Sequence, residues 1–283
     1  MIHVDFHSLT QPVGIVRLMA IIFTCISFSL VASVGYFPSS FWAWCMFTWC
    51  FCFFFTLLIV ILEVTTLSTK LPFAWDDFTT AFALLASLMC LTACVIYPTF
   101  FTCNICYRQI GASLVACACT VLYVLEVSLT RRRPSGQIRG FLTTWPGIMK
   151  MLETFFACLI FTSLEKSQYA NTPELQWCVA VYSLCFILAM LIILLTVGQV
   201  TSLLPFFEKI VIVYDILAAV MYMTAMVIWP LYSFRNNQRP IHCGYLCSWD
   251  KLGMVTFMTI LNFCVYIVDS VYSIWLVFCF SRE

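Results

Sequence analysis

"TACVIYP" at Thr92–Pro98 is followed 132 residues later by "TAMVIWP" at Thr224–Pro230. Two apolar segments with nearly the same sequence raise the question of whether the whole chain is an internal duplication. Self-similarity at a fixed offset is the signature of a repeated structural unit, so the comparison has to be extended to the rest of the sequence.

The similarity continues at three more places in the same order. "PVGIVRLMAIIFTCISF" from Pro12 aligns with "WPGIMKMLETFFACLIF" from Trp145 at an offset of 133, and "LPF" recurs at this offset. "VLYVLE" aligns with "CVYIVD" at an offset of 143, which places Glu126 over Asp269. The sequence therefore predicts two copies of one unit, residues 1–135 and 136–283.

Composition predicts that lipid is the solvent of this chain. Apolar residues make up 63% of it and charged residues 10%, with a mean hydropathy of +1.00. Soluble domains are roughly 45–50% apolar and about 25% charged. The net charge of +1 gives no indication of a nucleic-acid partner. The long apolar segment after the polar N-terminus predicts a spanning helix rather than a cleaved signal.

Eight segments are long enough to cross a hydrocarbon core, which takes about 20 helical residues. Their continuous apolar character favours helices over the alternating strands of a barrel, so we expect an all-α multi-pass membrane protein. The eight predicted spans are Pro12–Val34, Phe41–Glu63, Phe78–Tyr97, Ile110–Ser128, Trp145–Leu164, Leu175–Val200, Phe206–Tyr232 and Leu252–Phe280.

Four spans in each half predict that the two units are inserted the same way up, as two tandem parallel four-helix bundles. An inverted repeat, common in transporters, needs an odd number of spans in each half. Nine Lys and Arg fall on the side of the termini and five on the other side, and "RRRPSGQIR" supplies much of this bias. The positive-inside rule therefore predicts cytosolic termini.

Several phrases resemble those of one known family: "LTQPVGIVRL", "SFSLVASVG", "MFTWCFCF", "LETFFACLIF", "LQWCVAVYSLCFILA" and "CSWDK". Together they are similar to the myeloid-associated differentiation marker family, whose members carry tandem MARVEL domains, over about Leu9 to Phe278. The resemblance implies MARVEL-like four-helix units in a protein of the plasma membrane and of vesicles. It also implies cholesterol-rich membrane domains, membrane apposition, trafficking and cortical organisation, with no catalysis.

Cysteine placement predicts disulfides outside the membrane. Thirteen of the 17 cysteines lie in predicted spans, where we expect them to act as small apolar residues. Cys103 and Cys106 in "CNIC" and Cys243 and Cys247 in "CGYLC" occupy equivalent outer loops. Two local disulfides are preferred among the three connectivities that four cysteines allow, and a zinc site is the alternative. The resemblance supports a structural Cys243–Cys247 bridge.

Basic residues inside spans are expected near the inner headgroups. Arg17 and Lys150 occupy equivalent positions in the first or second turn of their spans, so we expect both to snorkel to the inner leaflet. Lys150 and Glu153 lie three residues apart on one helix face and are able to pair locally.

Three acids lie deeper. Asp215 has Ala83 as its counterpart, whereas Glu126 and Asp269 recur in both halves, each three residues after a tyrosine. We expect them to anchor helix packing through hydrogen bonds to Tyr, Ser or Thr. The alternative function is a channel or transporter in which these three acids line an ion or proton path.

Two surface features point to lipid contacts. Arg131, Arg132, Arg133 and Arg139 either hold anionic inner-leaflet headgroups or serve only as a topology signal. Aromatic residues concentrate in the second span: we expect Trp42, Trp44 and Trp49 at the outer interface. Phe51, Phe53, Phe54 and Phe55 are expected to suit ordered, sterol-rich lipid.

The residues contain no motif for catalysis or for a metal site, so no enzyme and no metal are expected. No cofactor is expected beyond bound cholesterol or phospholipid. The predicted function is a non-enzymatic organiser of cholesterol-rich membrane domains. Its expected partners are sterol-rich and anionic lipids and unidentified membrane or cortical proteins, with a homo-oligomer compatible with the sequence.

Overall fold

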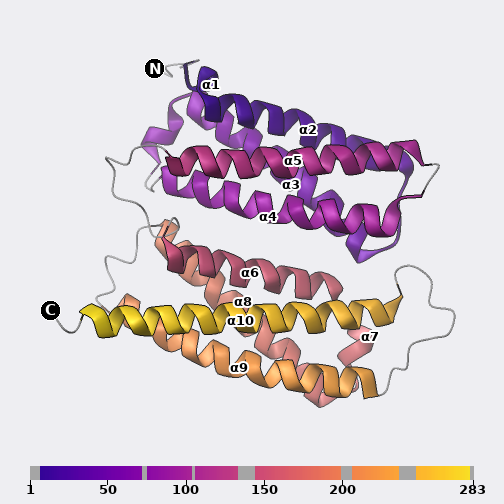
Figure 1. Cartoon of the computed structure of the whole chain (residues 1–283), viewed down its shortest axis with the longest axis vertical. Helices are drawn as coiled ribbons and strands as arrows, with labels where there is room; N and C mark the ends of the chain where they lie inside the picture. Colours follow the sequence, from indigo (N-terminus) through magenta and orange to yellow (C-terminus); the bar gives the residue numbers. More distant parts are fainter. Residues whose placement is uncertain are drawn as a thin grey trace. The chain divides into compact units, whose positions relative to one another are not determined.

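The structure, a computed structural model, describes residues 7–71, 75–103, 106–132, 144–198, 206–235 and 247–280. These residues form helices joined by short connections and include no strand, which confirms the all-helical fold class. The chain divides into two compact units, Met1–Gly140 and Phe141–Glu283. Figure 1 shows the long helices of each unit lying alongside one another.

The first unit is a four-helix bundle. Its long helices are α2 (Pro12–Val34), α3 (Ser40–Val64), α4 (Trp75–Phe101) and α5 (Tyr107–Arg132). The short α1 (His7–Thr10) precedes them, and the 3-10 helix Leu67–Lys70 follows α3. Both α2 and α4 pack on α3 and on α5, so the four helices form a closed ring around one core.

The second unit repeats this arrangement. Its long helices are α6 (Trp145–Ser163), α8 (Pro173–Val197), α9 (Phe207–Arg235) and α10 (Ser248–Phe280), with the short α7 (Lys166–Tyr169) after α6. Both α6 and α9 pack on α8 and on α10. The order of neighbours is that of the first unit, as expected when a duplicated sequence folds twice.

The two heptads at Thr92 and Thr224 make the same hydrogen bond in each unit. Thr92 in α4 accepts a hydrogen bond from the indole nitrogen of Trp44 at 3.2 Å. Thr224 in α9 accepts one from the indole nitrogen of Trp177 at 3.1 Å. Each threonine therefore joins the second and third long helices of its unit through an indole nitrogen, from a buried Trp44 in the first unit and from a Trp177 that is 47% exposed in the second.

The aromatic residues of the heptads fill the same place in each core. The ring of Tyr97 packs against Trp49 at a centroid distance of 5.5 Å, and Trp229 packs against Tyr182 at 6.2 Å. All four rings are buried. The heptads therefore carry equivalent contacts between the second and third long helices of the two units.

Seven of the described helices are long and apolar enough to cross a membrane: α2, α3, α4, α5, α8, α9 and α10. The remaining predicted span forms α6, a helix of 19 residues that carries Lys150 and Glu153 and is not among these seven. The prediction of eight spans and of cytosolic termini stays a prediction. Within its unit, α6 occupies the place that α2 has in the first unit.

The tryptophans of α3 correct one expectation. Trp44 and Trp49 do not face outward, because both are buried inside the bundle, and Trp42 is half-buried. Trp44 donates its indole hydrogen to Thr92, and the ring of Trp49 packs against Tyr97. Phe54 and Phe55 do face outward, whereas Phe51 is half-buried against the core of the first unit.

Removal of the Trp229 side chain is predicted to destabilise the second unit strongly. Trp229 is fully buried, and a buried Trp→Ala change costs about 3–5 kcal/mol because it leaves a cavity. The matched control is Trp275→Ala on α10, whose side chain is 58% exposed. The free energy of unfolding, measured in a lipid environment, should fall strongly for Trp229→Ala and little for Trp275→Ala. Equal decreases for both variants would contradict the assigned packing.

Candidate functional site

The first unit encloses a basic residue between two acids. Arg17 lies in the second turn of α2 and is only 4% exposed. Its Nε donates to Glu126 Oε1 on α5 at 2.5 Å, and its Nη1 donates to Glu63 Oε1 on α3 at 2.5 Å. Trp75, at the start of α4, donates its indole hydrogen to the same Glu63 oxygen at 3.0 Å. The guanidinium thus joins α2 to α3 and α5, and Trp75 of α4 joins the same network through Glu63.

The second unit encloses a lysine among three acids. Lys150 Nζ on α6 donates to both carboxylate oxygens of Glu153 at 2.9 Å and to Asp269 Oδ2 on α10 at 2.7 Å. It also donates to Asp215 Oδ1 on α9. All four side chains are completely buried within the unit. We call these four residues the Lys150 cluster.

Aromatic rings cover the ammonium group. Lys150 Nζ lies 5.3 Å from the ring centroid of Tyr214 and 5.7 Å from that of Tyr266. The two tyrosine hydroxyls hydrogen-bond to each other at 2.9 Å, and Tyr214 also donates to the backbone carbonyl of Cys185 on α8. The electron-rich faces of the two rings stabilise the ammonium cation. Because the tyrosine hydroxyls bond to each other and to the backbone, the carboxylates accept hydrogen bonds from Lys150.

The expectation that Arg17 and Lys150 snorkel to headgroups is wrong. Both point into their own bundle and are neutralised there by acids from other helices. An effective desolvation penalty of several kcal/mol per buried ion makes such a placement stable only when partners with good hydrogen-bond geometry surround the charge. The local Lys150–Glu153 pair does form, as one part of a larger cluster.

The acids also bind other partners than expected. We expected Glu126 and Asp269 to accept hydrogen bonds from Tyr, Ser or Thr, but they accept them from the basic residues Arg17 and Lys150. The nearby tyrosines bond elsewhere: Tyr123 to the hydroxyl of Thr56 at 2.7 Å, and Tyr266 to Tyr214. The tyrosine and the acid share a helix face and form two adjacent layers of polar contacts.

One ion pair is common to both units. Arg17 and Lys150 are equivalent in the repeat, as are Glu126 and Asp269, so each unit joins its first long helix to its last through the same pair. All four residues were predicted at matching positions, but no pairing between them was predicted. The signal was present, because a basic residue and an acid that recur together in both copies are candidates for mutual neutralisation.

The units differ in their additional acids. Glu153 and Asp215 stand where the first unit has Ala20 and Ala83, at offsets of 133 and 132. Glu63, which the sequence analysis did not single out, stands where the second unit has Thr196. Beyond the common pair, the second unit therefore holds two additional buried carboxyl groups, those of Glu153 and Asp215. The first unit holds one additional carboxyl group, that of Glu63, near the end of α3.

A small cavity lies beside the ion pair of the first unit. Its volume is about 110 Å³, and Arg17, Glu63, Asp76 and Thr130 contribute to its lining. The Glu63 side chain is 24% exposed, in contrast to the complete burial of the Lys150 cluster. Water therefore has access to one acid of the first unit but not to those of the second.

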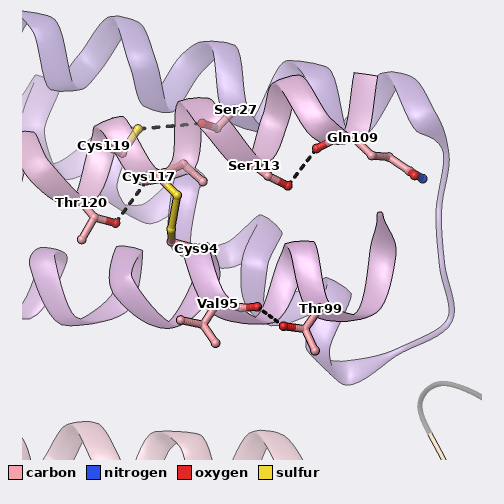
Figure 2. Close-up of a disulfide and its surroundings, with 10 residues drawn as sticks. Ser27, Cys94, Val95, Thr99, Gln109, Ser113, Cys117, Cys119 and Thr120 are labelled. Atoms are coloured by element: carbon pink, nitrogen blue, oxygen red, sulfur yellow. Dashed lines mark hydrogen bonds between the residues drawn. A yellow bond between two sulfur atoms is a disulfide. The ribbon is translucent and has the colours of Figure 1, made fainter. Parts of the chain in front are cut away.

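Two disulfides join described residues. One links Cys103 and Cys106 in the connection between α4 and α5, as the local pairing predicted. The other links Cys94 in α4 to Cys117 in α5 and corrects the expectation that in-span cysteines are unpaired (Figure 2). The two residues lie opposite each other on adjacent helices, an arrangement that sequence spacing does not reveal.

Two other predicted sites are described only in part. Cys247 is disulfide-bonded, but Cys243 lies outside the described residues, so their pairing stays a prediction. Helix α5 extends to Arg132, which places Arg131 and Arg132 in its last turn. Their side chains, together with Arg133 and Arg139, lie outside the described residues, so the inner-leaflet contact is also still a prediction.

A metal was not expected, yet three carboxyls are close enough to hold one. Within the described residues, oxygens of Glu153, Asp215 and Asp269 all lie within 4.8 Å of one another. Lys150 Nζ bonds to all three groups and therefore already supplies a cation at the point that they share. The arrangement consists of three carboxyl groups that surround the ammonium group of Lys150.

Comparison with known proteins agrees with the duplicated helical fold. The MARVEL family, described as a membrane-associating domain, matches residues 8–129 and again residues 141–272. The two bundles and the two matches define a tandem MARVEL-domain membrane protein. No solved structure matches the chain.

Three relatives are similar over almost the full length. The myeloid-associated differentiation marker of Homo sapiens is 42% identical over 290 residues, which cover 96% of this chain and 90% of that protein. The homolog of Xenopus laevis is 42% identical, with 96% and 94% covered. Myeloid-associated differentiation marker-like protein 2 of Xenopus laevis is 40% identical, with 96% and 95% covered. This chain belongs to the myeloid-associated differentiation marker family.

Loss of the Arg17 guanidinium is predicted to cost about 3–5 kcal/mol, because Arg17→Met leaves buried Glu126 without its cation. The double variant Arg17→Met/Glu126→Leu should recover most of the loss, since it removes both buried charges. Lys70→Met, at an exposed position, is the control and should change little. Free energies of unfolding in bilayers test this, and a double variant as unstable as Arg17→Met would contradict the pairing.

The Cys94–Cys117 bond is predicted to survive purification without reductant. After unfolding and alkylation, mass spectrometry should find the two cysteine-containing peptides joined, whereas Cys264, a free and exposed cysteine on α10, should be alkylated. Alkylation of both Cys94 and Cys117 without prior reduction would contradict the bond.

Proposed function

We propose that this protein is a non-enzymatic organiser of ordered, cholesterol-rich membrane domains of the plasma membrane and vesicles, acting in apposition, trafficking or cortical organisation. The observation that carries the proposal is the division of the side chains between inside and outside. Arg17, Glu126, Lys150 and Asp269 are turned inward and paired, while many large apolar side chains lie on the outer faces. Such a surface suits contact with lipid or with other membrane helices.

The two units offer lipid different surfaces at equivalent positions. Phe54 and Phe55 of α3 are exposed, and the repeat places exposed Ile187 and Leu188 of α8 at the corresponding positions. Rigid aromatic surface on one unit and flexible aliphatic surface on the other gives the chain two kinds of lipid contact. Bound cholesterol or phospholipid on the aromatic face is part of this proposal.

The names of the relatives support a role without catalysis. The domain is described as membrane-associating, and neither that description nor the relatives' names denotes an enzyme family. The alternative, a channel or transporter, required Asp215, Glu126 and Asp269 to line one path. Glu126 belongs to the first unit and the other two to the second, and each is bonded to the basic residue of its own unit.

Exchange of the exposed rings for their repeat counterparts tests the proposal. Phe54→Ile/Phe55→Leu is predicted to lower partition into the ordered phase of phase-separated vesicles by about twofold, equivalent to ~0.4 kcal/mol. The matched control, Ile187→Leu/Leu188→Ile, keeps aliphatic surface and should leave the partition unchanged. Fluorescence of the labelled protein in the two phases gives the partition directly.

Two results would contradict this function. One is wild-type protein that is excluded from ordered membrane together with both variants. The other is a current through reconstituted bilayers that Asp215→Asn abolishes, which would favour the channel instead.

A further inference from the structure

The cavity of the first unit lies where α2 and α4 begin and where α3 and α5 end. Each of these four helices contributes to its lining: Arg17 comes from α2, Glu63 from α3, Asp76 from α4 and Thr130 from α5. A volume of about 110 Å³ accommodates several water molecules, and therefore also a group of a few non-hydrogen atoms. Asp76 is exposed and the Glu63 side chain is 24% exposed, so the cavity is accessible from outside the bundle.

Acids outnumber bases around this cavity. Among its described lining residues Arg17 is basic and Glu63 and Asp76 are acidic, and Arg17 also binds Glu126. These three carboxylates and one guanidinium carry a formal charge of −2. Arg17 is already paired with Glu63 and Glu126, whereas Asp76 takes part in none of the ion pairs between described residues. The charge around the cavity therefore favours a cation.

Hydrogen-bond acceptors are also in excess, which is an independent observation. Both hydrogen bonds that Glu63 accepts end on Oε1, so its Oε2 is left for another donor. Glu126 Oε2 is buried and has no partner among the described residues. Thr130 lies one helical turn from Glu126 and donates its hydroxyl to the Glu126 backbone carbonyl at 2.8 Å, so the hydroxyl oxygen is still able to accept. A ligand that donates several hydrogen bonds fits these groups.

We propose that this cavity binds a primary ammonium group and that the headgroup of phosphatidylethanolamine supplies it. A primary ammonium carries a positive charge together with three N–H donors, which match the acceptors of Glu63, Asp76 and Thr130. Phospholipid headgroups and the ends of spanning helices both lie at the membrane surface, so such a headgroup lies within reach of the cavity. A free amine in solution carries the same chemistry, and the experiment separates the two sources.

Other occupants fit the cavity less well. Within the described residues, the three carboxyls close enough to share a metal ion are those of Glu153, Asp215 and Asp269, and the acids of this cavity are not among them. A choline group has no N–H to donate and is typically bound by aromatic rings, whereas none of the described lining residues is aromatic. An anionic headgroup would add to a negative charge that is already in excess.

The second unit supplies a matched control. The repeat places Thr196 at the position of Glu63 and Glu208 at the position of Asp76, at offsets of 133 and 132. Glu208, like Asp76, is an exposed acid in the first turn of its helix. The basic residue of its unit, Lys150, is instead completely buried among three acids. Glu208→Gln is therefore the control for Asp76→Asn. Binding of an ammonium group does not depend on the membrane-organising function.

Native mass spectrometry of the whole protein released from lipid nanodiscs tests the proposal. The nanodiscs contain equal amounts of phosphatidylethanolamine, its N-methyl and N,N-dimethyl derivatives and phosphatidylcholine, all with the same acyl chains. Retention should decrease with each methyl group, because each methyl replaces one N–H donor. Phosphatidylethanolamine should be retained about tenfold more than phosphatidylcholine, as expected for hydrogen bonds to charged groups.

Two variants locate this preference in the molecule. Asp76→Asn should lower the preference for phosphatidylethanolamine about threefold, because the lost ion pair is exposed and partly screened by solvent. Glu208→Gln should leave the preference unchanged. A preference that Asp76→Asn does not alter would overturn the assignment to this cavity.

A second arm of the experiment titrates ethanolamine into the same protein in phosphatidylcholine nanodiscs, with calorimetry as the measurement. Equal retention of the four lipids, together with one bound ethanolamine that Asp76→Asn weakens, would support the ammonium site and overturn the headgroup as its source. Equal retention of the four lipids with no binding of ethanolamine would overturn the proposal.

Discussion

A basic side chain on the first long helix of each unit is buried and binds its acid inside the bundle. Arg17 meets Glu126, and Lys150 meets Asp269, so in both units the first long helix is joined to the last. This contact closes the ring of four helices, because neighbours in sequence are already joined by short connections. Side-chain partners are worth forming here since an unpaired charge in hydrocarbon costs at least ~2.5–3.5 kcal/mol.

The rest of each core is arranged around that pair. Tyrosines lie one layer further along the bundle and bond to Thr56 in the first unit and to Tyr214 in the second. The heptads of α4 and α9 then form the next layer, where Trp49 and Trp229 are buried. The polar contacts lie inside each bundle and large apolar side chains lie outside. The surface that faces lipid therefore does not include these buried charges.

Much of this could be predicted from sequence, because the duplication gave two independent copies of every signal. The helical class, the four helices in each copy and the matching positions of the acids all followed from the offset comparison. The partners of Arg17 and Lys150 could not be predicted from single spans, since depth along one helix does not say which side faces a neighbouring helix. The same limit explains the buried Trp44 and the Cys94–Cys117 bond, both of which depend on facing surfaces of adjacent helices. The eighth span, α6, stays a prediction because its charged residues Lys150 and Glu153 lower its hydropathy. The same two residues belong to the Lys150 cluster.

The differences between the units show how one scaffold acquires new chemistry. Alanine at two positions of the first unit becomes Glu153 and Asp215 in the second, with the helices, the common ion pair and the tyrosine layer unchanged. The buried ammonium of Lys150 offsets the cost of burying the additional carboxyls, because it donates a hydrogen bond to each of them.

Solid-state NMR of the whole protein in phospholipid bilayers tests the central claim most directly. With Lys150 labelled by a ¹⁵N amine, the account predicts dipolar coupling from Nζ to the side-chain carboxyl carbon of Asp269 and no coupling to the ³¹P of lipid headgroups. Coupling to lipid phosphorus, without coupling to Asp269, would show that Lys150 reaches the membrane surface and would contradict the account.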